Sequence, residues 1–318
     1  MNNNWKKNIS FIYLFLFIFH LSCDGSKVNK NVDSDRLNEV DSARVAGDGY
    51  ANEEYLVRTH IPVISTYYMK GSIDEKYIFY MSFTVDSCKV DGTYNYEGKE
   101  KDIKVEGTIK DKEVRIEEKI YHEQKREYVS NGAYFAGVFD YDKGVIIGTW
   151  HSADGKRALP FKIANFYNTG YPQFDFKVNL KKETDESGYV SLNIDELYVR
   201  NKRTGSESIF SIDTHPLEST YAIFQQDFNF DGYPDIAMME FIPSYPPNKF
   251  LFWMYDPKDA MYYPSDILDE VYTLPEINYI DSTTTTVTIW HNQIHTQTYK
   301  FDGSKWILES SAAEDIGE

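Results

Sequence analysis

The chain has little of what holds many small exported proteins together or gives common enzymes their chemistry. Its 318 residues contain two cysteines, Cys23 and Cys88, which are too few for a disulfide framework. No GxSxG nucleophile motif, HExxH zinc motif or glycine-rich phosphate loop occurs. After the first two dozen residues, no apolar run is long enough to span a bilayer as a helix. These absences point away from disulfide-rich folds and from the familiar hydrolase and nucleotide-binding classes, and we expect no enzyme activity.

Positive charge is also scarce. The chain has 33 Lys plus Arg against 50 Asp plus Glu, a formal net charge of −17. Such a surface repels nucleic acid and anionic lipid, so neither is an expected partner. It suits a bound cation or a basic protein partner instead.

Aromatic residues are abundant, with 26 Tyr, 20 Phe and 5 Trp. This composition favours strands, and turn signals recur about every ten residues while helical periodicity is almost absent. We therefore predict an all-β protein with two meander-like blocks, each coiled into a barrel, sandwich or propeller-like form. Hairpin turns are expected at Asp91-Gly92, Asp154-Gly155 and Asp302-Gly303.

The first residues predict export. Lys6 and Lys7 precede a short apolar core, Ile9 to Leu21, and Ser22 leads into Cys23. This pattern predicts a lipoprotein signal peptide over 1–22, with Cys23 lipidated and the protein anchored to the outer membrane of a bacterial cell. His20 departs from the usual pattern, which leaves simple secretion or a retained anchor as alternatives.

Beyond Cys23, we expect three regions. Residues 23–58 are polar and predict a disordered tether. Residues 59–165 predict an N-terminal β-rich domain, and residues 172–312 predict a C-terminal β domain.

The sharpest chemical signal is "DFNFDGYPD", Asp227 to Asp235. Oxygen-bearing side chains occupy alternate positions of a stretch that is poor in strand-forming residues. The spacing is that of a calcium loop, in which a glycine, here Gly232, permits the turn. Its predicted ligands, four side chains and one main-chain carbonyl, are Asp227, Asn229, Asp231, the carbonyl of Tyr233, and Asp235.

The loop does not belong to a helical EF-hand. Met238 stands where that motif needs a bidentate glutamate, and the flanking residues favour strands. We therefore predict a strand–loop–strand site for Ca²⁺. The alternative is a solvated acidic turn that binds nothing.

Other candidate sites have ordinary explanations. His291 and His295 lie between Thr-rich strands and are interpreted as turn or strand residues rather than zinc ligands. Ser130–Tyr134, "SNGAY", could be an inhibitory loop, but a turn before a strand explains it as well. Trp150, Trp253, Trp290 and Trp306 could line a glycan groove, although core packing is the simpler role.

The chain resembles two groups of bacterial envelope proteins. "MKGSID", "DGTYNY", "IKVEGTI", "GVIIGTW" and "DGKRALPF" resemble small β-rich domains of lipoproteins. "DFNFDGYPDIAMMEF", "NKFLFWMYDPKDAMYY", "LPEINYID" and "YKFDGSKWIL" occur in the same order in envelope proteins of the wider group with integrin-like (VCBS-like) aspartate loops. The resemblance implies a calcium-binding lipoprotein that inhibits lysozyme-like peptidoglycan hydrolases, although no motif here defines an inhibitory surface.

The expected function is thus a lipid-anchored, calcium-binding module that binds and inhibits an envelope or secreted protein, with a wall hydrolase as the candidate partner. The alternative is a non-catalytic lipoprotein that binds glycan or peptidoglycan. A hydrolase with an unrecognised site is the third hypothesis.

Overall fold

The structure is a computed structural model, and it describes residues 57–99, 101–166, 169–184, 188, 190–212, 222–240, 249–268, 271, 273–279, 281–290 and 292–316. The predicted signal peptide, Cys23 and nearly all of the predicted tether lie outside these residues. The described strands all belong to one unit, Asn38–Glu318.

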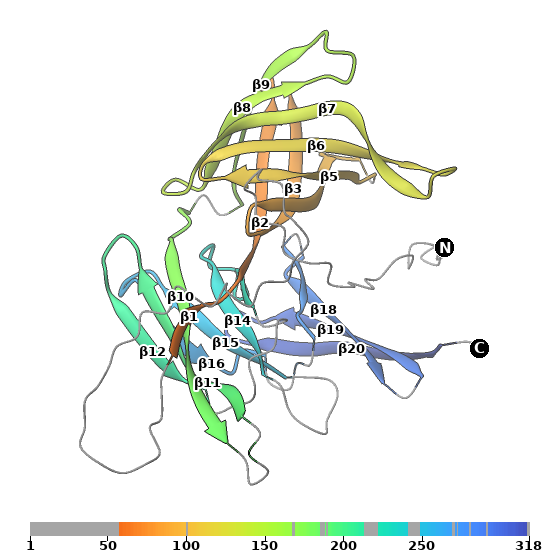
Figure 1. The fold of residues 1–318 in the computed structure, drawn as a ribbon. Helices are drawn as coiled ribbons and strands as arrows, with labels where there is room; N and C mark the ends of the chain where they lie inside the picture. The colour runs from red at the N-terminus through yellow and green to blue at the C-terminus, as the bar shows by residue number, and fades with distance from the viewer. Residues whose placement is uncertain are drawn as a thin grey trace. The chain divides into compact units, whose positions relative to one another are not determined.

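The prediction of an all-β protein is confirmed, because every regular element among the described residues is a strand (Figure 1). The scarcity of helical periodicity in the sequence explains this result.

No helix in the described part of the chain has the length and apolar character needed to cross a membrane.

The first block is a closed eight-stranded antiparallel barrel. Each strand pairs with the next along the chain, and β2 also pairs with β9, which closes the barrel. Its strands are β2 (Val63–Ile73), β3 (Tyr77–Asp86), β4 (Lys89–Tyr96), β5 (Ile103–Lys110), β6 (Glu113–His122), β7 (Glu127–Asp140), β8 (Val145–His151) and β9 (Ala158–Asn165). Of the forms that the sequence allowed, the barrel is the one observed for this block.

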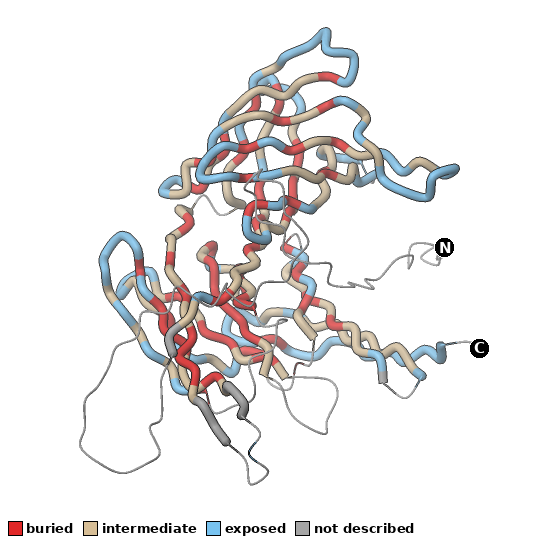
Figure 2. The backbone as a smooth tube through the Cα atoms, viewed as in Figure 1, coloured by how far each residue is buried: buried red, intermediate tan, exposed pale blue. Residues whose placement is uncertain are grey.

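Side-chain alternation builds the barrel core. In β3, the inward side chains of Phe79, Met81 and Phe83 are almost completely buried, while their neighbours are partly exposed. Figure 2 shows buried residues recurring among exposed and partly exposed ones along the barrel strands. Successive side chains of a strand point to opposite faces, so this period of two places one face of every strand inside the barrel.

Glycines allow the main chains of neighbouring barrel strands to approach each other closely. A Cβ atom on Gly71 would collide with the carbonyl oxygen of Lys162 and lie 2.6 Å from the Cα atom of Ile163. Gly71 therefore lies where β2 meets β9 and the barrel closes.

The hairpin predicted at Asp91-Gly92 is wrong. Both residues lie inside β4, and the turn falls at Ser87 and Cys88. Ser87 adopts the left-handed conformation that this turn needs, with φ of 59°. Gly92 serves close packing instead, because a Cβ there would lie 2.6 Å from the Cα atom of Phe83. The turns predicted at Asp154-Gly155 and Asp302-Gly303 are confirmed.

The second block is built from two further sheets and an extension of the barrel sheet. One sheet has the order β1-β10-β11-β12, and another has the order β17-β18-β19-β20. Their strands are β1 (Val57–His60), β10 (Phe174–Thr184), β11 (Val190–Asn201), β12 (Glu207–Ser211), β17 (Glu276–Asn278), β18 (Thr283–Trp290), β19 (Gln293–Phe301) and β20 (Trp306–Asp315).

Four more strands extend the barrel sheet in the order β16-β15-β14-β13-β2. They are β13 (Ile223–Gln226), β14 (Asp235–Glu240), β15 (Lys249–Asp256) and β16 (Met261–Ser265). The parallel β13–β2 pairing spans Val63 to Ser65, so β2 belongs to both blocks. The Ser65 hydroxyl also donates to the Gln225 side chain at 3.0 Å.

Candidate metal-binding loop

The aspartate-rich segment is a strand–loop–strand unit, as predicted. Strand β13 ends at Gln226, β14 begins at Asp235, and the two pair antiparallel. Both strands are largely buried, with Ile223 in β13 and Ile236, Ala237 and Met238 in β14 in the core, together with the polar residues Gln225, Gln226 and Asp235. The geometry of the loop is therefore set by a two-stranded frame at its ends.

Two residues of the loop take left-handed backbone conformations. Gly232 has φ of 89°, which agrees with its predicted role in the turn. Phe230 has φ of 61°, an uncommon value for an aromatic residue. Its ring packs against the rings of Tyr279, Phe301 and Trp306, with centroids 5.2 to 5.6 Å apart. These aromatic contacts hold the loop in its strained conformation.

Short-range hydrogen bonds order the exposed side of the loop. An oxygen of Asp231 accepts from the main-chain N–H of Tyr233 at 2.8 Å. The side-chain oxygen of Asn229 accepts from the N–H of Asp231 at 3.0 Å, and its amide donates to the carboxylate of Asp231 at 3.2 Å. Asn229 and Asp231, two of the predicted ligands, are thus adjacent.

Asp227 is the predicted ligand that has a buried side-chain oxygen without a hydrogen-bond partner. Its side chain is buried, with the residue 9% exposed, and Oδ2 accepts from the N–H of Gly232 at 2.8 Å. Its Oδ1 is also buried and has no hydrogen-bond partner. Burial, and secondarily the charge of Asp231, raise the pKa of the Asp227 carboxyl to about 7. A buried carboxylate oxygen without a donor is costly unless another positive group satisfies it.

Asp235 has a different role from the other predicted ligands. It is fully buried, and its two oxygens accept from the N–H of Phe228 at 2.8 Å and of Tyr255 at 2.9 Å. Burial, followed by the charge of Asp227, raises its pKa well above the ordinary value. Asp235 therefore ties the start of the loop to β15, a role that its spacing in the sequence did not reveal.

Residues distant in sequence also hold the loop. The Tyr279 hydroxyl donates to the carbonyl of Asp227 at 2.5 Å, and the Trp306 indole N–H donates to the carbonyl of Phe228 at 2.9 Å. The side chains of Asn165 and Thr169 both donate to the carbonyl of Gly232. Sequence reasoning missed all four supporting residues, because no local pattern marks a contact made across such separations.

A small cavity of about 10 Å³ lies beside the loop. It is lined by the loop residues Asp227, Gly232, Tyr233 and Pro234 together with Thr66, Tyr68, Asn165, Tyr171 and Tyr279. Such a volume holds about one water-sized occupant. Asp227 and Tyr233, two of the predicted ligands, thus line the same cavity.

The loop brings oxygen atoms near one another but does not form a complete metal-coordination site. Among the described residues, no group of three or more His, Cys, Asp or Glu side chains stands arranged to hold a metal ion. The available donors are the unpartnered Oδ1 of Asp227 and the carboxylate and amide oxygens of Asp231 and Asn229. Hard oxygen donors of this kind suit Ca²⁺ better than softer transition metals.

The remaining candidates of the sequence take structural places. Ser130–Tyr134 is not a loop, because it lies within β7 beside a bulge opposite Glu118. The Asn131 amide donates to the buried carboxylate of Glu118 at 2.9 Å. His295 lies in β19, as interpreted, whereas His291 lies outside the described residues. Trp253 and Trp306 are buried in the core.

Comparison with known proteins adds little. No protein-family model matches the chain, and no curated protein matches it. Among solved structures, the chain is similar to a structural-genomics protein from Lactobacillus plantarum, with 10% identity over 77% of this chain and 96% of that one. The TM-score is 0.25, a similarity that carries no argument about fold or function.

Proposed function

We propose that the Asp227–Asp235 loop binds Ca²⁺. The carrying observation is the buried Oδ1 of Asp227, which makes no hydrogen bond and belongs to a carboxyl whose pKa is raised by burial and by the charge of Asp231. A divalent cation would satisfy this oxygen and remove the repulsion between the carboxylates. Asp227, Asn229, Asp231 and the carbonyl of Tyr233 would hold the ion. Asp235 completes the ligand set or, through its two hydrogen bonds, holds the loop in position.

The role of the ion in this proposal is structural. Ca²⁺ binds the folded loop and not the unfolded chain, so it stabilises the protein by mass action, by about 2.7 kcal/mol at a hundredfold excess over the dissociation constant. Mg²⁺ substitutes poorly because it prefers octahedral sites and retains its water. The experiment is a thermal melt with Ca²⁺, Mg²⁺ or chelator.

A matched pair of variants makes the melt specific. We expect Asp231→Ala to remove the Ca²⁺-dependent rise in Tm. Asp142→Ala removes another exposed aspartate, in the β7–β8 turn, and is expected to retain the full rise. Because Asp231 also accepts local hydrogen bonds, the readout is the difference between calcium and chelator for each variant, not the absolute Tm. No calcium shift in the unaltered protein, or an equal shift in Asp231→Ala, means that the loop is only an acidic turn.

We further propose that the protein is a lipid-anchored, non-catalytic binding module of the bacterial cell envelope that inhibits a lysozyme-like peptidoglycan hydrolase. Its support is the signal-like start ending at Cys23, the acidic composition and the resemblance of the loop-containing segment to calcium-binding inhibitor lipoproteins. An acidic surface attracts a basic enzyme by long-range electrostatics.

Affinity capture tests the partner. The full chain is immobilised and exposed to periplasmic and secreted fractions with and without chelator. Recovery of a wall hydrolase, and loss of its activity on adding the protein, supports the proposal. Retention of purified peptidoglycan without any protein partner instead identifies a glycan-binding module and overturns it.

A further inference from the structure

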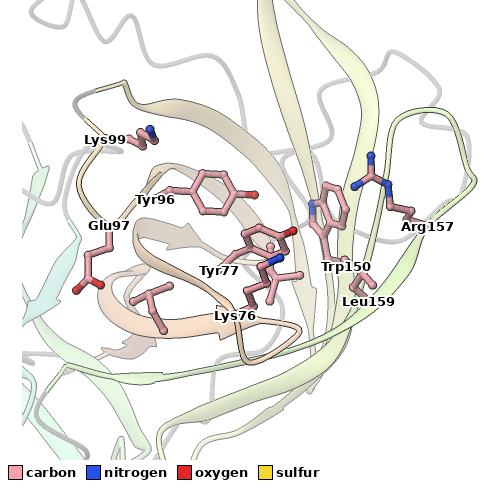
Figure 3. Close-up of a pocket in the computed structure, with 10 residues that line it drawn as sticks. Lys76, Tyr77, Tyr96, Glu97, Lys99, Trp150, Arg157 and Leu159 are labelled. Atoms are coloured by element: carbon pink, nitrogen blue, oxygen red, sulfur yellow. The ribbon is translucent and has the colours of Figure 1, made fainter.

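One end of the barrel carries a hollow of about 500 Å³. It is formed where β2, β4 and β8 end and where β3 and β9 begin, so the turns β2–β3, β4–β5 and β8–β9 surround it. Its described lining is Ile73, Lys76, Tyr77, Ile78, Tyr96, Glu97, Lys99, Trp150, Arg157 and Leu159 (Figure 3). This volume lies within the range of small-molecule pockets, about 300 to 1,000 Å³.

The floor of the hollow is aromatic and aliphatic. Trp150, Tyr96 and Leu159 are partly buried against the barrel core. Figure 3 shows the rings of Tyr77, Tyr96 and Trp150 between the ends of the surrounding cationic side chains. An apolar body placed here would be removed from water on contact with these rings.

A buried network fixes the orientation of Trp150. Its indole N–H donates to Glu118 Oε1 at 3.0 Å, and the Tyr94 hydroxyl donates to the same oxygen at 2.6 Å. The other carboxylate oxygen accepts from the amide of Asn131 at 2.9 Å. The ring of Trp150 is thus set in place before any ligand arrives, which lowers the entropic cost of binding.

The rim is cationic although the protein carries a net charge of −17. Lys76, Lys99 and Arg157 line it, and none of the three forms an ion pair with another described residue. The ammonium of Lys76 lies 5.0 Å from the centroid of the Tyr77 ring.

Glu97 is the one carboxylate in the lining, and it is engaged elsewhere. It accepts from the Tyr80 hydroxyl at 3.2 Å and lies 3.7 Å from the ammonium of Lys70. Neither partner lines the hollow. The rim therefore presents three cations to a ligand.

We propose that this hollow binds a small amphipathic anion. The apolar or aromatic body of the ligand packs on Trp150, Tyr96 and Tyr77. Its carboxylate, sulfonate or phosphate head lies between the rim cations, where Arg157 offers a planar pair of donors and the lysines add charge. A neutral sugar is disfavoured, because the floor has few polar groups to pair with its hydroxyls.

The test compares two fluorescent probes that share one aromatic body. 8-Anilinonaphthalene-1-sulfonate carries a sulfonate, whereas N-phenyl-1-naphthylamine is its uncharged counterpart. The full chain is titrated with each. We expect saturable binding of both probes, with the sulfonate bound more tightly than the uncharged probe. The affinity for the sulfonate is expected to fall as the salt concentration rises, because salt screens the rim charges.

Variants locate the binding. The double variant Lys76→Ser/Arg157→Ser is expected to lower the affinity for the sulfonate probe about tenfold, because two exposed charge contacts are lost. The affinity for the uncharged probe is expected to stay the same. Tyr77→Ser, at a residue 41% exposed and outside the Glu118 network, is expected to weaken both probes without unfolding the barrel. Lys162→Gln removes an exposed lysine of β9 outside the hollow and is expected to change neither.

Decanoate is then expected to displace the sulfonate probe better than decanol does. The proposal is overturned if sulfonate binding is the same in the double variant, if Tyr77→Ser changes neither probe, or if the uncharged probe binds as tightly as the sulfonate. The titration is expected to be identical with calcium or chelator, so its outcome is independent of the calcium proposal.

Discussion

The Oδ1 atom of Asp227 is a buried carboxylate oxygen that makes no hydrogen bond. Its neighbour Oδ2, in contrast, accepts a hydrogen bond from the N–H of Gly232. A carboxyl in this position has two ways to lower its free energy. It can take up a proton, or it can bind a cation.

The competition between proton and cation predicts a pH dependence. The pKa of Asp227 is raised from 3.8 to about 7 in the fold. The metal-free fold is therefore favoured by this group below about pH 4, and that stabilisation is lost as pH rises towards 7. We expect the Tm of the metal-free protein to fall over this range, and the gain from Ca²⁺ to grow over the same range. Melts between about pH 5 and 8, with and without chelator, measure both.

Asp227→Asn is the control for this pH dependence. The amide cannot ionise, so we expect the fall in Tm of the metal-free protein to become shallower. A Tm that rises from about pH 5 to 8 in the unaltered metal-free protein, or a variant with the same slope, contradicts the assignment.

For single residues, the sequence predicted which side chains belong to the loop, but not which hydrogen bonds they make. Alternation predicted which side chains of Asp227 to Asp235 share a loop, because ligand spacing is local. It did not predict that Asp235 uses both oxygens on main-chain N–H groups, since the partner Tyr255 lies on another strand. Nor did it predict the contribution of Trp306, which depends on tertiary folding.

Among the elements, β14 and β15 depend on Asp235. Replacing it by Ala leaves the N–H groups of Phe228 and Tyr255 buried without acceptors. We expect Asp235→Ala to lower the free energy of unfolding by about 3 kcal/mol. The loss is expected with chelator as well as with Ca²⁺, unlike the calcium-specific effect of Asp231→Ala. Denaturant melts in both conditions measure it, and a loss confined to the calcium sample would refute the clamping role.

Closure of the barrel depends on Gly71. Its added Cβ would collide with the main chain of β9, so Gly71→Ala forces β2 and β9 apart. Overpacking of this kind costs about 1–3 kcal/mol or more. Ser72→Ala, at the next position of β2, is the control and is expected to change the denaturation midpoint little. Equal midpoints for the two variants would show that this strand crossing can relax.

The failures of prediction among the elements have one physical origin. Asp91-Gly92 has the composition of a tight turn, but Gly92 lies inside β4. Glycine is needed there because β3 approaches so closely that a Cβ atom would collide with it. Ser130–Tyr134 also looked like a loop, yet the bulge in β7 and the acceptor Glu118 keep it in the sheet. Turn propensity is a local quantity, and close approach of neighbouring strands overrides it.

For the whole molecule, the sequence predicts an anchor at a residue outside the described part of the chain. We expect Cys23→Ser to move the protein from the membrane fraction to the soluble fraction, because the acyl chains are lost. Mass spectrometry of the unaltered protein is expected to show acylation at Cys23. A variant that still fractionates with membranes, together with an unaltered protein without acyl chains, would refute the anchor.

Strand β2 pairs with strands of both blocks, and this implies an order of folding. The barrel strands pair with their neighbours along the chain, so most of their contacts form through short loops. The second block instead needs partners such as Ser65 and Gln225, which are 160 residues apart. Since closing long loops is slow, the barrel is expected to form early and to display one prepared edge of β2, on which β13 later docks. The barrel would then act as a template for the half of the chain that contains the Asp227–Asp235 loop.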